Sequence, residues 1–203
     1  AIDKWKKLGF QQIEILGNVT ATSKKNKQFE VRMAVANLGG AHITWIEPIS
    51  GNSVFSKFHA DYGDGAMSLV HELSSKTALY NEIDRLSAIE VKVLDKLLFS
   101  TPKGKLNVTL VDTWKQGKYV LGYVTRETSD DLHAGLTSEN QHNMKLTQFA
   151  FAIKKTEDIS EYWSKIGFPE FQINHPELGE TKYHGEIVAV SYTHLTLPTK
   201  RIV

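Results

Sequence analysis

Four polar residues on two segments of alternating polarity have the spacing of a shared binding face. His42 and Thr44 are two residues apart in the first segment, and Ser68 and Glu72 are four apart in the second. Side chains alternate between the two faces of a strand, so we expect these four residues to form one polar, ligand-binding patch. Glu72 would act as a general base if it were buried beside His42, because burial strengthens a carboxylate as a base. In the alternative, Glu72 lies in water at the rim of a cavity and His42 only completes a turn.

The other histidines fit structural roles better than catalytic ones. His71 has the opposite parity to the patch and should face away from it, toward solvent or a packed helix. His175, His184 and Glu186 lie together in HPELGETKYHGE, but their spacing matches no compact metal motif. We expect that segment to be a solvated connection.

The elements that must position the patch are helices alternating with short runs of strands. Helices are expected at residues 2–8, 53–62, 75–88 and 158–166, where apolar residues recur at helical spacing behind capping residues. Strands are expected at residues 11–16, 29–37, 42–46, 66–73, 91–100, 106–112, 119–124 and 149–153. Asn18 to Lys27 reads as a mobile loop, and Pro48 should close the strand at 42–46. Single helices followed by antiparallel strands favour an α+β fold over a parallel one.

The start of the chain has a counterpart near its end. Leu8-Gly9-Phe10 resembles Ile166-Gly167-Phe168, and Trp5 aligns with Trp163 at an offset of 163 − 5 = 158. The neighbouring segments agree in predicted structure and order. The sequence therefore predicts two copies of one architecture.

The sequence pattern of the last residues differs from that of the rest of the chain. Val190 to Lys200 is VSYTHLTLPTK, which resembles the translation of a common sequencing-library adapter. Its alternating Thr and apolar residues would otherwise pass for a strand. We expect residues 189–203 to be a non-native tail with few packed contacts, and we give His194 no functional weight.

The composition restricts the classes of partner that the protein is expected to bind. A net charge of +1 creates no field that would attract nucleic acid or an anionic membrane, and no apolar run approaches the roughly 18 residues of a spanning helix. The absence of Cys excludes disulfides, zinc ribbons and thiolate nucleophiles, and suits the reducing cytoplasm, where we expect the protein to be located. We expect a small, uncharged or mildly anionic ligand, no nucleic acid and no membrane, with a homodimer as an open alternative.

The stretch from Ala34 to Leu73 resembles the middle of methylmalonyl-CoA epimerase-like proteins in the vicinal oxygen chelate (glyoxalase-like) superfamily. The features that coincide in order are the Leu38-Gly39-Gly40 turn, the strand closing in Ile46-Glu47-Pro48, the small helix ending at Phe58, and Gly63-Asp64-Gly65 before a strand. The resemblance implies an α+β fold of paired βαβββ modules that form a curved mixed sheet around a cavity. We therefore expect a first module at residues 1–127 that lacks its first strand and a truncated second module at 145–188. Residues 128–144, which are polar and have no apolar periodicity, are the expected linker between them.

In that superfamily the cavity usually holds a divalent metal. At the positions that match the family's ligands this chain has Thr44, Ser68 and Gly122 in the first module and Gln148 in the second. Neutral hydroxyls and amides are poor ligands for transition metals, and glycine has no donor. We therefore expect no metal in the first module, and we count Gln148 with the ligand-binding patch.

Two functions remain open on the sequence. In the first, the chain is part of a tandem glyoxalase-like protein that binds a small molecule and whose first module has lost the metal ligands. In the second, it is a metal-dependent isomerase, lyase or dioxygenase of the same superfamily, with the metal and the active site in the missing part of the second module. The sequence leaves open whether the protein is an enzyme.

Overall fold

The protein forms two compact units. The computed structural model describes residues 2–10, 12–24, 27–39, 41–137, 147–169 and 171–174, with short strands at 181–183, 186–188 and 194–196. Unit 1 comprises Ala1–Asp112 and Tyr119–Phe149, and unit 2 comprises Thr113–Lys118 and Ala150–Val203. No helix in the described part of the chain is both long and apolar enough to cross a membrane.

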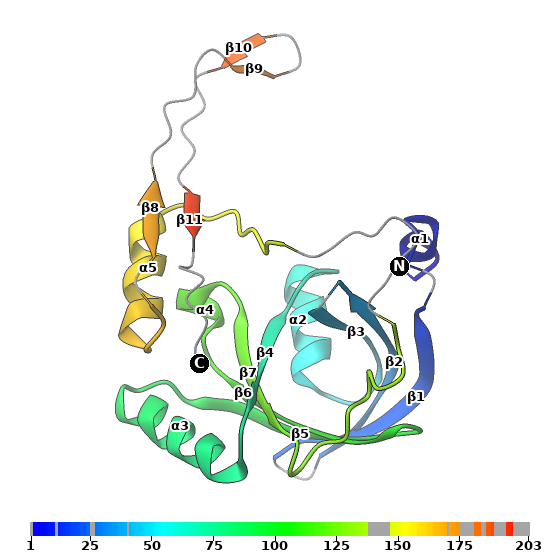
Figure 1. Ribbon diagram of the computed structural model, residues 1–203. Helices are drawn as coiled ribbons and strands as arrows, with labels where there is room; N and C mark the ends of the chain where they lie inside the picture. The colour runs from blue at the N-terminus through cyan, green and yellow to red at the C-terminus, as the bar shows by residue number, and fades with distance from the viewer. Residues whose placement is uncertain are drawn as a thin grey trace. The chain divides into compact units, whose positions relative to one another are not determined.

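Unit 1 is built on one seven-stranded mixed sheet that curls into a half-barrel (Figure 1). The strand order is β3-β2-β1-β5-β6-β7-β4, and all neighbours are antiparallel except β4 and β7. The strands are β1 (Glu14–Thr22), β2 (Gln28–Leu38), β3 (Ala41–Ser50), β4 (Ser68–Leu73), β5 (Val93–Thr101), β6 (Gly104–Val111) and β7 (Val120–Thr125). This is the α+β fold with a curved mixed sheet that the sequence predicts.

The sheet divides into two groups of strands, and each group contains a helix that is followed by three antiparallel strands. The second group is a βαβββ succession, β4-α3-β5-β6-β7, whose first strand runs parallel to its last; the first group is α1-β1-β2-β3. The helices of this unit are α1 (Ile2–Lys7), α2 (Val54–Tyr62) and α3 (Lys76–Ala88). The hydroxyls of Ser53 and Ser75 accept hydrogen bonds from backbone N–H groups three residues on, which fixes where α2 and α3 begin.

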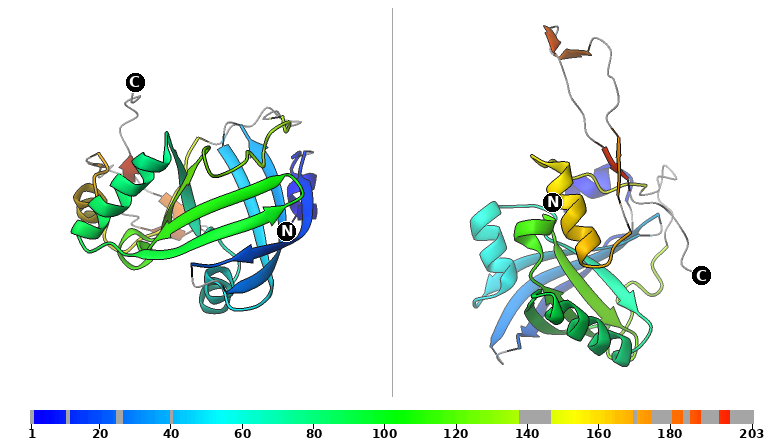
Figure 2. Two further views of the ribbon diagram at one scale, coloured as in Figure 1. Left: turned by 90° about the horizontal axis from the view of Figure 1, so that it is seen from below. Right: turned by 90° about the vertical axis from the view of Figure 1, so that its left-hand side faces the viewer.

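The two faces of the sheet carry different helices. Phe55 of α2 packs against Phe29 and Phe99 on the inner face, with ring centroids 6.3 and 6.0 Å away. On the outer face, Trp45 of β3 packs edge-on against Trp5 of α1. Figures 1 and 2 show the sheet curling around α2, with α1 and α3 outside the curl. Burial of this apolar surface on both faces is the main stabilising contribution to unit 1.

Strand register assigns the predicted patch to one face. Partners across a ladder share a face, as do alternate residues along a strand. The inner-face path from β3 to β4 runs through Thr44, Val35, Phe29, Ala21, Phe99, Leu106, Leu110, Gly122 and Val70. By alternation, His42 joins Thr44 on this face, and Ser68 and Glu72 join Val70.

Three segments of unit 1 and its border differ from the sequence expectations. Strand β1 continues through Asn18 to Thr22, where only a polar loop was expected, because these residues pair with β2 and the last three of them also pair with β5. Strand β3 continues past Pro48 to Ser50, which is tolerated because β3 is an edge strand and a proline there need not donate to a ladder. Residues 149–153, expected as a strand, have no strand pairing in the structure.

Unit 2 is organised around two helices, α4 (Trp114–Gly117) and α5 (Thr156–Lys165). The indole of Trp163, only 2% exposed, donates to the carbonyl oxygen of Gly117 at 3.1 Å. A Cβ on Gly117 would lie 2.4 Å from the indole ring, so only glycine permits this approach. Short strands β8 (Gln172–Asn174), β9 (Thr181–Tyr183), β10 (Glu186–Val188) and β11 (His194–Thr196) form two antiparallel pairs, β8 with β11 and β9 with β10. The pairing of β11 is a contact made by the segment expected to be a non-native tail.

Helices α1 and α5 end in the same way. Each ends in a left-handed glycine followed by phenylalanine: Gly9 has φ 95° and Gly167 has φ 98°. In each, the phenylalanine N–H donates to the tryptophan carbonyl five residues back, and the glycine N–H donates to the carbonyl three back. These are the two hydrogen bonds of a Schellman motif, and the Phe and Trp rings meet edge-on at 5.3 and 4.9 Å.

Candidate functional site

A segment after β7 crosses the inner face of the half-barrel. We call residues 126–137 the strap. Its first half pairs with β6: the N–H of Asp130 donates to the carbonyl of Lys105 at 2.7 Å, and the N–H of Lys105 donates to the Asp130 carboxylate at 2.7 Å. Ser129 makes a similar reciprocal pair with Asn107. Leu132, 2% exposed, anchors the middle of the strap in the core.

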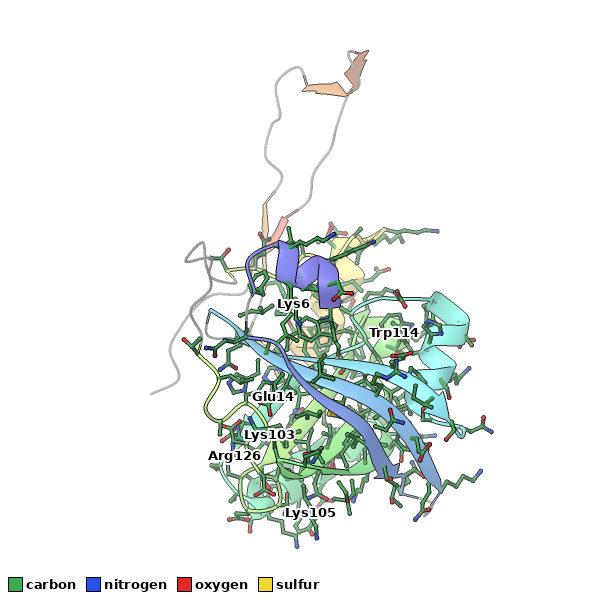
Figure 3. The ribbon with its side chains drawn as sticks, turned by 90° about the vertical axis from the view of Figure 1, so that its right-hand side faces the viewer. Lys6, Glu14, Lys103, Lys105, Trp114 and Arg126 are labelled. Atoms are coloured by element: carbon green, nitrogen blue, oxygen red, sulfur yellow. The ribbon has the colours of Figure 1, made fainter. Side chains whose placement is uncertain are left out.

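The second half of the strap is held by the far end of the sheet. Lys103 lies in the β5–β6 turn, near Glu14 of β1 (Figure 3). Its ammonium donates to the carbonyl of Ala134 and to the Glu14 carboxylate, each at 2.9 Å. Asn37 on β2 donates its side-chain amide to the carbonyl of Leu136 at 2.8 Å. Side chains from β1, the β5–β6 turn and β2 therefore fix the course of the strap, whose residues 128–137 fall in the predicted linker.

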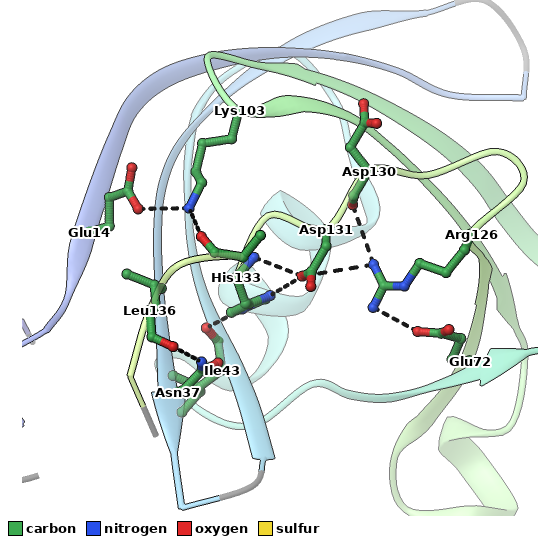
Figure 4. Close-up of polar contacts among 11 residues, drawn as sticks. Glu14, Asn37, Ile43, Glu72, Lys103, Arg126, Asp130, Asp131, His133 and Leu136 are labelled. Atoms are coloured by element: carbon green, nitrogen blue, oxygen red, sulfur yellow. Dashed lines mark hydrogen bonds and ion pairs between the residues drawn. The ribbon is translucent and has the colours of Figure 1, made fainter. Parts of the chain in front are cut away.

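The strap connects the two edge strands through a chain of charged and imidazole groups (Figure 4). Glu72 on β4 pairs with Arg126 at 2.6 Å, and the same guanidinium lies 3.8 Å from Asp131. The Asp131 carboxylate accepts from the N–H of His133 at 3.0 Å. The His133 ring stacks on His42 of β3, with centroids 4.2 Å apart and planes 18° apart. The inner face thus carries a continuous polar chain from β4 to β3.

Burial and charge set the protonation of this chain. Burial lowers the pKa of His133, and the positive charge that His42 can carry lowers it further, against the opposing effect of its contact with the Ile43 carbonyl. Burial raises the pKa of Asp131, but the His133 N–H and the nearby Arg126 and His42 outweigh it, so this pKa is lowered. At neutral pH, Asp131 is therefore a carboxylate and His133 a neutral imidazole.

The structure places the predicted patch residues on the inner face, near the two open edges. His42 and Glu72 belong to the polar chain but are linked through the strap: the Glu72 side chain is 48% exposed and pairs with Arg126. This arrangement is the rim position of the alternative reading, and it occupies the carboxylate that would have served as a base. Thr44 and Ser68 are half-buried on the same face. Gly122 faces inward too, and a Cβ there would lie 3.0 Å from side chains on both neighbouring strands.

The other candidates lie elsewhere. Gln148 is exposed and belongs to no strand, so the structure does not bring it to the inner face through sheet pairing. His71 pairs in register with Tyr123 on the outer face, where burial lowers the pKa of its imidazole. His175 and His184 lie outside the described residues.

Sequence reasoning missed the three strap residues Arg126, Asp131 and His133. They follow the strand predicted at residues 119–124, in or beside a segment rich in Ser, Thr, Asp, Asn and His, which is typical of linkers. The one available signal was Leu132, a single apolar residue between Asp131 and His133. An isolated leucine in a polar segment is weak evidence for an anchor, because scattered surface leucines are common.

Comparison with known proteins adds little to this geometry. No family model matches the chain, and no curated protein matches it. Among solved structures, a hypothetical protein, BH1468 from Bacillus halodurans C-125, aligns with a TM-score of 0.40 and 14% identity, over 60% of this chain and 81% of that one. The half-barrel of unit 1 is consistent with a glyoxalase-like βαβββ fold.

Proposed function

We propose that unit 1 binds a small molecule on the inner face of its half-barrel, between the β3 and β4 edges. The observation that carries this proposal is that four polar side chains from the two edge strands lie on one face: His42 and Thr44 from β3, Ser68 and Glu72 from β4. These side chains are accessible, whereas the middle of the same face is filled by the Phe29, Phe55 and Phe99 cluster. An apolar floor beside a few accessible polar groups is the usual composition of a ligand site.

The donors and acceptors favour an uncharged or mildly anionic ligand. Arg126 is the cation of the polar chain, but Glu72 and Asp131 both lie against it, so the chain cannot balance a strongly anionic molecule. Asn37, the register partner of His42, has a buried side-chain Oδ1 for which no hydrogen-bond partner is found in the described residues.

We also propose that the chain is a tandem glyoxalase-like protein related to the methylmalonyl-CoA epimerase-like group. The βαβββ succession of β4 to β7 supports this, as do the matching Schellman ends of α1 and α5. At the positions of the family's metal ligands, Thr44, Ser68 and Gly122 offer no charged or imidazole donor. Binding through shape and hydrogen bonds is therefore the role we assign to the inner face at these positions.

The proposal is tested by mapping ligand contacts with the metal-free full chain. Amide chemical shifts would be recorded in EDTA against a defined panel of small hydroxy acids, keto acids and primary amides. We expect at least one compound to shift amides saturably in residues 41–44, 68–72 and the strap. A panel without saturable shifts, or with shifts confined to the outer face, would contradict a site between the two edges.

Paired leucine substitutions separate the inner face from general surface effects. Ser68→Leu adds bulk on the inner face next to Glu72 and should abolish binding of the compound that shifts the wild-type protein. Ser87→Leu adds the same bulk at an exposed position of α3, on the outer side, and should leave binding unchanged. Equal loss in both variants would show that the site has been placed wrongly.

A further inference from the structure

We propose that His42, Asp131 and His133 form a binding site for a divalent first-row transition-metal ion, distinct from the metal positions suggested by the glyoxalase-like resemblance. One ligand atom from each of the three lies within 4.8 Å of the others. Two of the residues come from the strap and one from β3, so tertiary structure alone assembles the site. The metal site shares His42 with the proposed small-molecule site but rests on a separate observation, and it revises the expectation that the first module lacks a metal.

His133 has the hydrogen bonding of a metal ligand. Its Nε2 lies 3.1 Å from the carbonyl oxygen of Ile43, a contact in which the imidazole nitrogen must be protonated and donate. The other nitrogen, Nδ1, then carries the lone pair, and it lies 4.0 Å from the Asp131 carboxylate. Histidines that bind metals commonly donate their second nitrogen to a backbone carbonyl, which fixes the tautomer and the ring orientation.

Asp131 supplies the charge that the ion requires. The N–H of His133 and the guanidinium of Arg126 hold its carboxylate in place. The Arg126 guanidinium is 3.8 Å from the Asp131 oxygen, whereas it is 2.6 Å from Glu72. The His133 and Arg126 contacts are made at Oδ1 of Asp131, and a carboxylate has two oxygens with about four lone-pair positions, so the group can still bind a cation.

His42 is the adjustable ligand. Its ring is stacked nearly parallel on His133, and an ion between two parallel rings would lie outside the planes that contain the nitrogen lone pairs. His42 must therefore turn about its side-chain bonds to bind. It is exposed, which leaves room for this rotation, whereas the Ile43 carbonyl fixes the His133 ring. Metal binding should consequently separate the two rings.

The donor set indicates the class of ion. Two imidazoles and one carboxylate suit zinc, cobalt, nickel or iron(II), whereas magnesium and calcium prefer all-oxygen sites. Three protein ligands leave at least one coordination position for water or another molecule, as in catalytic rather than structural sites. The site lies on the inner face, where such a position would be accessible.

The test is a titration of the purified full chain with Co²⁺, followed by visible absorption, and with Zn²⁺, followed by calorimetry. We expect one ion to bind per chain, and we expect the visible d–d absorption of Co²⁺ to change as imidazole nitrogens coordinate it. His42→Ala should weaken binding by more than about tenfold, because one of three protein ligands is lost. His42 is an exposed residue, so this variant should keep the fold of unit 1.

The matched control is His59→Ala. His59 is also exposed and also lies near a carboxylate, with its Nε2 3.3 Å from Asp64, but no third ligand accompanies it in the described chain. This variant should bind Co²⁺ as the wild type does. Absence of saturable binding at about 1 mM Co²⁺, or equal affinity in His42→Ala and the wild type, would overturn the proposal.

Histidine ring NMR provides a readout that a loosely attached ion would not give. On addition of Zn²⁺, His133 should keep its proton on Nε2 and change its Nδ1 shift, and the His42 ring signals should move as stacking is lost. Coordination of His133 through Nε2 would break the contact with Ile43 and would contradict the geometry argued above.

Discussion

Replacing Leu132 by alanine should destabilise unit 1 substantially, because this leucine is the apolar anchor of the strap. Its side chain is 2% exposed. Removing three buried carbon groups at about 0.8 kcal/mol each costs about 2.4 kcal/mol in transfer free energy. The cavity left behind raises the expected loss to about 2–5 kcal/mol, according to how far the surroundings relax. A flexible linker would show no such cost.

Urea denaturation provides the measurement, with the midpoint and slope compared between variants. Leu8→Ala removes the same atoms from a leucine of unit 1 that is 57% exposed, and should change the free energy of unfolding by no more than about 0.5 kcal/mol. Hydrogen exchange in Leu132→Ala should speed up most in the strap and in the β6 amides that pair with it. A loss below about 1 kcal/mol, or one equal to that of the control, would refute the view that the strap is an integral part of the half-barrel.

Two further predictions concern the sheet. Gly122→Leu should lower the free energy of unfolding by about 1–3 kcal/mol through overpacking, because a Cβ would already lie 3.0 Å from the side chains of Leu110 and Val70. A variant as stable as the wild type in urea denaturation would refute the tight inner-face packing at β7. Partial desolvation lowers the pKa of His71 below its ordinary value of 6.5, so the unfolded chain takes up a proton there before the folded one does. Stability should therefore fall as the pH drops below that value, by a small amount because the residue is still exposed to water. His71→Asn should flatten this part of the stability profile measured between pH 7.5 and 5, and an unchanged slope would show that other groups cause it.

The sequence by itself determined the elements whose signals are local. The serines at positions 53 and 75 cap α2 and α3 because the donors they satisfy lie three residues away. The glycines at positions 9 and 167 end α1 and α5 because left-handed backbone favours glycine. Alternation identified β2, β3 and β4 and the faces of their polar residues, since a period of two follows from strand geometry alone.

Tertiary structure decided how far the strands extend and what joins them. Residues 18–22 extend β1 because β2 pairs with all of them and β5 with residues 20–22, a stabilisation that no local pattern reports. Residues 149–153 have a strand-like pattern but no strand pairing in the described chain, and a pattern without a partner does not make a strand.

In the candidate site, too, sequence identified some of the residues, and only the tertiary structure showed how they are connected. His42 and Glu72 could be selected from sequence because strand parity fixes their faces, but their connection through Arg126, Asp131 and His133 could not. The 2.6 Å ion pair joins Glu72 to Arg126, which are 126 − 72 = 54 positions apart, and the stacked imidazoles are 133 − 42 = 91 positions apart. The remaining contacts lie within the strap and depend on the path that the buried Leu132 gives it. Such contacts form only after the sheet has curled, because the two edge strands must first be brought within reach of one short segment.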